Sequence, residues 1–367
     1  MVQKIPVSAL SNNVSFKNTI INGDMRIAQR QTSSTGLTSS TTAPGVDRFN
    51  LTISGLGTWT VQQSTDVPAG EGFSNSLKFD NTTADASPAS GDFAMCQYKY
   101  EGQHLQGFNK GTASAKKFAV SFYVKSSKTG THIVSLSDQD NSRQVSQAYT
   151  VDSADTWEHK KMIFPADTTG TFDNDNAFSM QIFWWLGAGS DRTSGTLNTS
   201  WGSITNANRA VGQVNLADNT SNNWYITGVQ VEVGDQCSEF EHLPHDIQLR
   251  RCQRYFQMFN DGSYDNEGLF NGTLYTTSTL YGYISLQTPM RAGPSLYEVT
   301  GTDYWVAYTN GSNNTFDDMG INGDASNTFI CEVYVPSSGN LSLGSGGQSA
   351  FVRTHNAAAR LGADAEL

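Results

Sequence analysis

Charged residues are scarce in this sequence, and the two signs are unbalanced. Asp, Glu, Lys and Arg make up 16% of its 367 residues, and 34 acidic against 23 basic side chains give a formal net charge of −11. Lys and Arg nowhere form a long run. Because a protein that binds DNA or RNA needs a basic surface to attract phosphates, we expect no nucleic-acid partner.

Long hydrophobic runs are also missing. No stretch approaches the roughly 20 apolar residues that a helix needs to cross a bilayer, so we expect no membrane association. The opening residues, MVQKIPVSALSNNVSF, lack the apolar core and the small-residue cleavage site of a secretory signal. We therefore expect the protein to be made in the cytoplasm and to stay there unless something carries it out.

Cysteine is rare, and familiar catalytic motifs are absent. Cys96, Cys237, Cys252 and Cys331 are widely separated and lack the paired spacing of a zinc site, so free thiols are expected rather than disulfides. The six histidines show no metal-binding spacing, and neither a phosphate-binding loop nor a nucleophile elbow is present. We expect no enzyme activity, no catalytic residue and no required cofactor.

Two pairs of acidic residues are the candidates for glycan hydrolysis. Asp138 and Asp140 lie in SDQDNS, and Asp173 and Asp175 lie in FDNDNAF. Hydrolysis would need two carboxylates about 5 to 10 Å apart, one of them with a raised pKa. Because Asp and Asn are also the commonest turn residues, we expect solvated turns at both places, with calcium ligation and catalysis as alternatives.

Short apolar stretches separated by Ser, Thr, Asn and Gly dominate the chain up to residue 240. In several of them apolar residues occupy every second position, which is the pattern of a strand with one buried face. About eight to ten such strands within residues 16–240 predict an antiparallel jelly-roll sandwich in an all-β protein. The alternating sets are Phe49, Leu51 and Ile53; Phe118, Val120, Phe122 and Val124; Phe178, Met180, Ile182, Trp184 and Leu186; and Val229, Val231 and Val233.

Residues 241–260 carry a helical pattern and are predicted to form a short amphipathic linker helix. In IQLRRCQRYFQMF, which follows Pro244 and the candidate N-cap Asp246, apolar residues recur at steps of three and four. A helix of about 12 residues is marginal alone, so this stripe packs either on its own domain or on copies of the chain around a shared axis. The stripe consists of Leu249, Cys252, Tyr255, Phe256 and Phe259.

Residues 261–367 are predicted to form a second, β-rich domain, which serves as a tip or in oligomerisation. Phe329, Cys331, Val333 and Val335 alternate in one strand, and the opposite face of that strand is also largely apolar. A strand covered on both faces in so small a domain indicates burial against a neighbouring subunit. We therefore add Phe329 and Val333 to the expected oligomerisation surface.

One aromatic group in the first domain is a candidate glycan site. Trp185 shares its face of a predicted strand with Phe183, so we expect this pair to point outward. The polar loop GAGSDRTSG follows, in which Asp191 and Arg192 can supply hydrogen bonds beside the flat ring. The other tryptophans of this domain are expected in its core: Trp59, Trp157, Trp184, Trp201 and Trp224.

A second aromatic group lies in the C-terminal domain. Tyr304, Trp305 and Tyr308 precede the polar stretch TNGSNNTFDD. Exposed aromatic residues beside Asn and Ser are typical of binding loops, so we predict a ligand contact at the tip. An inter-subunit contact is the alternative.

The junction between the two predicted domains carries the stretches GVQVEVG (228–234), SEFEHLP (238–244) and RRCQRYF (250–256). These stretches resemble tail-fibre and tail-tip proteins of bacteriophages. In that family a GVQ-E-G strand closes a jelly roll and is followed by an FE-x-x-P/Y link and a helix ending in CQRYF/Y. IINGDMRIAQRQ and APGVDRFN resemble the first strands of these fibres, and LQTPMRAGPSLYEVTG and GADAEL resemble their tips. The matching residues of the junction are Gly228, Val229, Gln230, Glu232, Gly234, Phe240, Glu241, Cys252, Gln253, Arg254 and Tyr255.

The resemblance implies a structural protein of the virion that assembles as a homotrimeric fibre. Its parts would be a virion-attachment peptide (1–15), a carbohydrate-binding-like jelly roll (16–240), the linker helix (241–260) and the tip domain (261–367). Its partners would be its own copies, other virion proteins, and a glycan or protein of the host cell surface. Because the attachment peptide is short, a capsid or collar decoration fibre is the first alternative, and a small polysaccharide depolymerase is the second.

The resemblance also implies a structural calcium ion. Carbohydrate-binding jelly rolls often hold one near their first and last strands, where Asp24, Asp47 and Glu232 would lie in this chain. Carboxylate oxygens are the ligands that calcium prefers.

Overall fold

The computed structural model describes residues 16–260 and 262–367, and the chain divides into two compact units. The first unit ends at Gln248, and the second spans Leu249–Glu366. Both are built from antiparallel sheets, which confirms the prediction of an all-β protein. The predicted attachment peptide, residues 1–15, lies outside the described residues.

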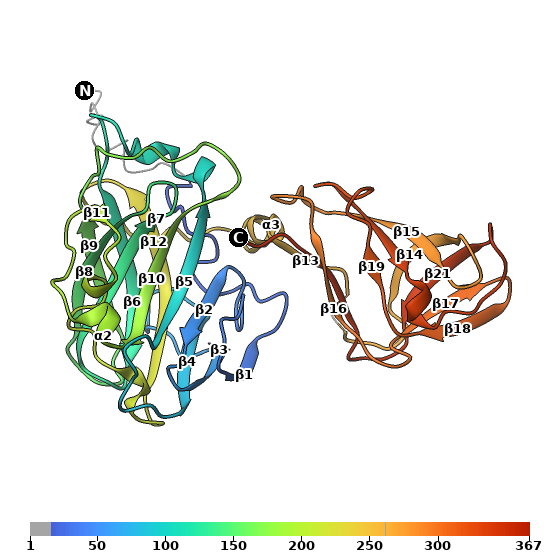
Figure 1. Cartoon of the computed structure of the whole chain (residues 1–367), viewed down its shortest axis with the longest axis horizontal. Helices are drawn as coiled ribbons and strands as arrows, with labels where there is room; N and C mark the ends of the chain where they lie inside the picture. Colours follow the sequence, from blue (N-terminus) through green and yellow to red (C-terminus); the bar gives the residue numbers. More distant parts are fainter. Residues whose placement is uncertain (1–15, 261) are drawn as a thin grey trace, which may run out of the picture. The chain divides into compact units, whose positions relative to one another are not determined.

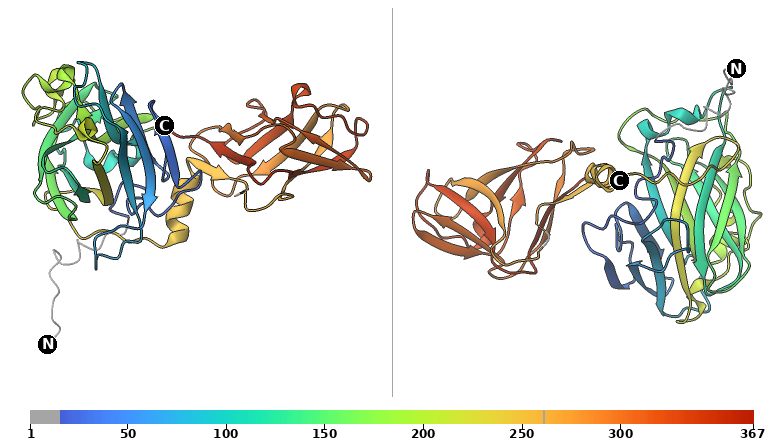
Figure 2. Two further views of the ribbon diagram at one scale, coloured as in Figure 1. Left: turned by 90° about the horizontal axis from the view of Figure 1, so that it is seen from below. Right: turned by 180° about the vertical axis from the view of Figure 1, so that it is seen from behind.

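The first unit is a sandwich of two six-stranded antiparallel sheets (Figure 1, Figure 2). Sheet A contains, in spatial order, β1 (Ser33–Leu37), β3 (Thr58–Ser64), β4 (Ser76–Thr83), β12 (Asn223–Val233), β6 (Phe118–Ser126) and β9 (Glu158–Phe164). Sheet B contains β11 (Gly202–Ser203), β8 (Arg143–Val151), β7 (Gly130–Asp138), β10 (Phe178–Ala188), β5 (Phe93–Glu101) and β2 (Phe49–Ser54). Consecutive strands such as β5 and β6 lie in opposite sheets, as in a jelly roll.

Side chains between the two sheets form the core of this unit. Ile182, Trp184 and Leu186 of β10 are fully buried, as their alternation predicts. The ring of Trp184 meets that of Phe122 in the opposite sheet at a centroid distance of 5.6 Å. Val233 departs from the predicted pattern, because it is the last residue of β12 and remains 43% exposed.

The GVQVEVG stretch of β12 fixes the segment that leaves the sandwich. Gly228 has a φ of +61° at a register shift between β12 and β6, and a Cβ added there would lie 2.7 Å from an aromatic ring, so only glycine fits. Gln230 accepts a hydrogen bond from the backbone N–H of Glu241 (2.9 Å), and Glu232 accepts one from that of Ser238 (2.7 Å). Gln230 and Glu232 thus hold the segment around residues 238–241 against β12.

The linker helix is shorter than predicted. Helix α3 spans His245–Gln253, with Asp246 in its first turn rather than at the N-cap. Residues Phe256–Met258 form strand β13 instead, because they pair with β22 (Arg360–Asp364). The other helices of the described residues have a single turn: η1 (Gly102–His104), η2 (Gln106–Phe108), α2 (Ser190–Thr193), η3 (Asn206–Asn208), η4 (Leu216–Asp218) and η5 (Ser337–Gly339).

The second unit contains a three-stranded and a seven-stranded antiparallel sheet. The smaller sheet consists of β13, β22 and β16 (Ser295–Val299). The larger sheet contains, in spatial order, β18 (Ser312–Phe316), β17 (Trp305–Thr309), β21 (Ser349–Thr354), β14 (Gly268–Leu274), β15 (Leu280–Ser285), β20 (Ile330–Val335) and β19 (Gly320–Ile321). Leu274, Trp305 and Val333 belong to the core on its inner face.

The prediction about the cysteines can be checked directly. The four cysteines are free thiols, as predicted; Cys237 is partly buried and the other three are buried. No helix in residues 16–260 and 262–367 combines the length and apolar character needed to cross a membrane.

Candidate functional site

A row of aromatic and polar side chains crosses the outer face of the seven-stranded sheet. Tyr308 of β17 lies opposite Phe351 of β21, and Phe351 lies opposite Asn271 of β14. Tyr283 of β15 continues the row and lies opposite Glu332 of β20. Because successive side chains of a strand point to opposite faces, these residues point away from the core that their neighbours fill. Five strands of the second unit, from β14 to β21, thus build one surface.

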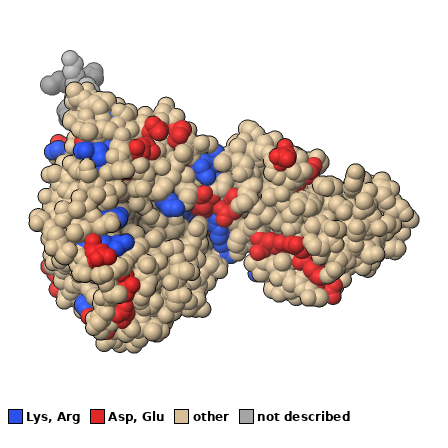
Figure 3. All heavy atoms as spheres, in the orientation of Figure 1, with Lys and Arg blue, Asp and Glu red and all other residues tan. Residues whose placement is uncertain are grey.

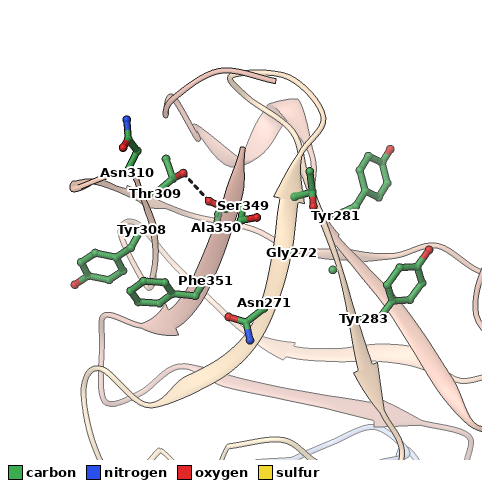
Figure 4. Close-up of a pocket in the computed structure, with 12 residues that line it drawn as sticks. Asn271, Gly272, Tyr281, Tyr283, Tyr308, Thr309, Asn310, Ser349, Ala350 and Phe351 are labelled. Atoms are coloured by element: carbon green, nitrogen blue, oxygen red, sulfur yellow. Dashed lines mark hydrogen bonds between the residues drawn. The ribbon is translucent and has the colours of Figure 1, made fainter. Parts of the chain in front are cut away.

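This row borders an open groove with a volume of about 660 Å³. Figure 4 shows the rings of Tyr308 and Phe351 on one side and those of Tyr281 and Tyr283 on the other, with Asn271 between them. Tyr283 exposes 56% of its surface and Phe351 exposes 39%. A cluster of exposed aromatic side chains rimmed by polar groups marks a contact site for a ligand or a partner.

Close packing under the groove fixes its floor. Gly272 and Gly282 lie opposite each other in β14 and β15, and a Cβ added to Gly282 would lie 2.3 Å from the ring of Phe270 in the core. At one end, the Thr309 hydroxyl donates a hydrogen bond to the carbonyl oxygen of Ser349 (2.6 Å). The strands under the groove are therefore closely packed, and a side chain at position 282 would collide with Phe270 in the core.

Opposite charges lie at the two ends of the row. The Arg353 guanidinium lies 5.6 Å from the ring centroid of Tyr308 and 4.9 Å from that of Phe351, within the range of cation–π attraction. At the other end, a hydrogen bond with the Glu332 carboxylate raises the pKa of the Tyr283 hydroxyl, because it stabilises the protonated phenol. The groove thus offers flat rings and neutral hydrogen-bonding groups between one cation and one anion.

Of the three aromatic residues predicted to contact a ligand at the tip, Tyr308 lines the groove. The prediction is wrong for Trp305, which points inward from β17, has no exposed surface and donates a hydrogen bond from Nε1 to the Thr300 hydroxyl (2.9 Å). Tyr304 is partly buried and packs against the same core. The alternation within β17 therefore separates neighbours that the sequence places in one group.

The predicted glycan site of the first unit also differs from expectation. The prediction that Trp185 points outward to solvent is wrong, since its side chain has no exposed surface. The segment after α2 folds over the outer face of sheet B, so that Ala210 packs into one cluster with Phe183 and Trp185. Arg192 reaches the edge of this cluster, over the ring of Phe93, while Asp191 is exposed.

The other tryptophans of the first unit fall into two groups. Trp59, Trp184 and Trp224 are buried, as predicted. Trp157 and Trp201 are only partly buried, contrary to prediction, and their indole N–H groups make hydrogen bonds near the surface. Trp157 donates to the Asp66 carboxylate (2.9 Å) and Trp201 to the carbonyl oxygen of Pro165 (2.8 Å).

Most of the predicted oligomerisation residues are buried within the chain. Four have no exposed surface and offer nothing to a second copy: Cys252, Tyr255, Phe256 and Val333. Leu249 and Phe259 are partly buried. Phe329 directly precedes β20 and is 63% exposed, so it is available for a contact. The homotrimer itself stays a prediction.

The three predicted calcium ligands are engaged separately. Asp24 pairs with Arg26 (2.8 Å), Asp47 accepts a hydrogen bond from the backbone N–H of Gln29 (2.9 Å), and Glu232 holds the segment around residues 238–241. Within residues 16–260 and 262–367, no group of three or more His, Cys, Asp or Glu side chains is placed to bind a metal. The described geometry therefore gives no support to a calcium site.

One of the predicted turn carboxylates belongs to a buried ion pair. Asp138 is fully buried with an oxygen 2.5 Å from Nζ of Lys110, which also lies 3.1 Å from Asp167. Arg143 adds a second ion pair to Asp167 at 2.7 Å. The prediction of a solvated turn is thus wrong for Asp138, whereas the other three members of the two acidic pairs are exposed.

The groove contains residues that the sequence did not single out. Tyr281 and Tyr283 alternate along β15, which is a signal for a shared face. Asn271 and Phe351 carry no such signal, because only the pairing of β14 with β21 brings them together.

On the face shown in Figure 3, charged side chains form small separate groups and most of the surface is uncharged.

Comparisons with known proteins give distant structural likenesses. No family model matches the chain, and no curated protein sequence matches it. It is similar to the enzymatically active domain of bacteriophage CBA120 tailspike protein 4, with 17% identity and a TM-score of 0.31 over 59% of this chain and 21% of that one. A CBM22-1 xylan-binding domain from Paenibacillus barcinonensis gives 11% identity and a TM-score of 0.27, over 56% of this chain and 99% of that one. A family 11 carbohydrate-binding module of a Clostridium thermocellum cellulase gives 14% identity and a TM-score of 0.26, over 54% of this chain and 93% of that one.

Proposed function

We propose that this protein is a non-enzymatic fibre protein of a bacteriophage virion, a homotrimer that binds a host cell-surface glycan through the groove of its seven-stranded sheet. The observation that carries the glycan part is the row formed by Tyr308, Phe351, Asn271 and Tyr283. The virion part is supported by the sequence resemblance at the junction between the two units.

The chemistry of the groove suits a sugar chain. The apolar C–H face of a pyranose stacks on flat aromatic rings, while amide and hydroxyl groups bind its hydroxyls. Tyr283 and Phe351 are exposed and lie on opposite sides of Asn271 (Figure 4). Because neutral groups line the groove between its charged ends, a neutral or weakly charged glycan segment fits it best.

Binding without hydrolysis is supported by where the carboxylates lie. The groove-lining residues, all in the described part of the chain, include no Asp or Glu, whereas a glycoside hydrolase needs two carboxylates flanking the scissile bond. Glu298 has its pKa raised to about 8, chiefly because burial disfavours its charged form, but it makes a hydrogen-bonded contact with Asp318. Such a pair is too close to hold a sugar between its members.

The test measures retention of the full-length protein in gels that contain purified bacterial lipopolysaccharides or capsular polysaccharides. The double variant Tyr283→Ala and Phe351→Ala removes the two exposed rings. Since each ring contact contributes about 0.5–1.5 kcal/mol, retention by the best polysaccharide should weaken on the order of tenfold or more. Tyr264→Ala is the matched control, because Tyr264 is 71% exposed and does not line the groove.

Three further measurements separate the alternatives. Sedimentation of both variants reports the oligomeric state: a loss of trimer with unchanged retention would make the groove a subunit interface instead. Electron microscopy of the virion with an antibody fragment against the second unit locates the protein, and labelling of the head would favour a decoration fibre. New reducing ends in the incubated polysaccharide would make the protein a depolymerase.

A further inference from the structure

Two arginines come together on the outer face of sheet B, in the first unit. Arg192 lies in α2, and Arg209 directly follows η3. A backbone hydrogen bond from the N–H of Ala210 to the carbonyl oxygen of Arg192 (2.9 Å) ties the two segments together. The two guanidinium groups thus come from separate turns that are locked to each other.

Both guanidinium groups lie on the same aromatic cluster. Arg192 Cζ is 4.1 Å from the ring centroid of Phe93, and Arg209 Cζ is 5.3 Å from that of Phe183 and 5.5 Å from that of Trp185. The rings contact one another, with centroids 6.2 Å apart for Phe93 and Trp185. A hydrogen bond from Trp185 Nε1 to the Ser135 hydroxyl (3.2 Å) fixes the central ring. The cluster is therefore a rigid floor under two cations.

Neither arginine has an acidic partner in residues 16–260 and 262–367, although the chain has an excess of 11 negative charges. The exposed Asp191 acts on Arg192 only at longer range. Burial and then the charge of Arg192 lower the pKa of Arg209 to about 10. The Nε atoms of both side chains are buried and donate no hydrogen bond. Each Nη1 donates one long hydrogen bond of 3.5 Å, from Arg192 to the carbonyl oxygen of Gly91 and from Arg209 to Oδ1 of Asn206.

Two neighbouring guanidinium groups repel each other. An anionic group bound by their Nη atoms would relieve this repulsion, because its oxygens accept charge-assisted hydrogen bonds from planar donors. The partly exposed ring of Phe93 would at the same time contact the apolar face of the molecule that carries the anion.

We propose that Arg192 and Arg209 together bind one anionic substituent, a carboxylate, sulfate or phosphate, of an acidic polysaccharide on the host surface. This proposal rests on the proposed glycan-binding function and adds a second subsite, in the first unit, that selects acidic chains. Trp185 contributes as the buried floor of this subsite, with Phe93 as the partly exposed ring at its edge.

The test uses three polymers with one backbone: dextran, carboxymethyl dextran and dextran sulfate. Affinity electrophoresis of the full-length protein should show retention by at least one charged polymer and none by dextran. Arg192→Gln and Arg209→Gln should each weaken that retention by about 10- to 100-fold, as expected when a hydrogen bond to a charged group is lost. Arg250→Gln is the control, because it removes the same charge from an exposed position.

Each outcome decides the proposal. Carboxymethyl dextran and dextran sulfate distinguish a carboxylate from a sulfate or phosphate ligand. If both arginine variants retain the charged polymers as the wild type does, or if the wild type retains none of them, the proposal is wrong. Arg192→Gln covers the case in which Arg209→Gln does not fold, since Arg192 is partly exposed. The groove variant Phe351→Ala should leave this retention unchanged, so a failed groove does not count against the arginine site.

Discussion

The rings of Tyr308 and Phe351 stack nearly parallel, with centroids 4.9 Å apart and an interplanar angle of 9°. They are direct cross-strand neighbours in β17 and β21, and Arg353 covers both rings. The two rings therefore pack as one unit at this side of the groove rather than as two independent side chains. This geometry makes the aromatic character of position 351 more important than its volume.

Substitutions at Phe351 test that inference directly. Phe351→Tyr keeps the flat ring and should bind polysaccharide as the wild type does. Phe351→Leu keeps apolar volume but loses the ring, so binding should weaken by about 0.5–1.5 kcal/mol, measured by isothermal titration calorimetry with the retained polysaccharide. Equal affinities of the two variants would contradict stacking as the mode of binding.

The burial of Trp185 predicts a structural penalty that an exposed sugar-stacking residue would not show. Trp185→Ala should lower the free energy of unfolding by about 3–5 kcal/mol, because it leaves a cavity between sheet B and the covering segment. Trp157→Ala is the comparison, since Trp157 is partly exposed, and its cost should be clearly smaller. Guanidinium denaturation followed by circular dichroism measures both, and similar costs would contradict the burial of Trp185.

The strands were predictable from the sequence, but not all of what covers them. Alternation in β10 correctly identifies Ile182, Trp184 and Leu186 as core residues. Nothing local to Phe183 and Trp185 indicates that a segment some 25 residues downstream folds over their face, as the burial of Ala210 with them shows. A period of two reveals two faces, and only tertiary structure decides how each is covered.

The helix and the groove show the same limit. The spacing from Leu249 to Phe259 fits a helix, yet Phe256–Met258 pairs with β22 in a sheet. This partner strand lies about a hundred residues further along the chain, so the local spacing does not reveal it. In the groove, Tyr281 and Tyr283 were visible as an alternating pair, whereas their approach to Phe351 depends on the register between β14 and β21. Local patterns carry no information on such long-range pairing.

Breaking the buried ion pairs of Lys110 should strongly destabilise the first unit. Its Nζ lies 2.5 Å from Asp138 and also donates to the carbonyl oxygens of Thr169 (3.0 Å) and Gly170 (2.7 Å). Lys110→Met would leave the fully buried Asp138 carboxylate without its cation, at a cost of about 3–5 kcal/mol in the free energy of unfolding. Lys116→Met, at an exposed position, should change it by less than about 0.5 kcal/mol. Urea denaturation at neutral pH compares the two.

The Glu298 carboxyl should make the second unit less stable as the pH rises. Burial, followed by the charge and hydrogen bond of Asp318, raises its pKa from 4.5 to about 8. The folded state therefore binds the proton more tightly than the unfolded state, so this contribution to stability is complete below about pH 4.5 and is lost progressively up to about pH 8. Glu298→Gln imitates the protonated form and should remove this part of the decline, so that the variant unfolds at a higher temperature than the wild type at pH 8.5.

The exposed Asp324→Asn serves as the control in the same unit, and its melting temperature should follow the wild type at every pH. Parallel melting curves of wild type and Glu298→Gln between pH 5 and pH 8.5 would show that Glu298 is ionised in the folded protein.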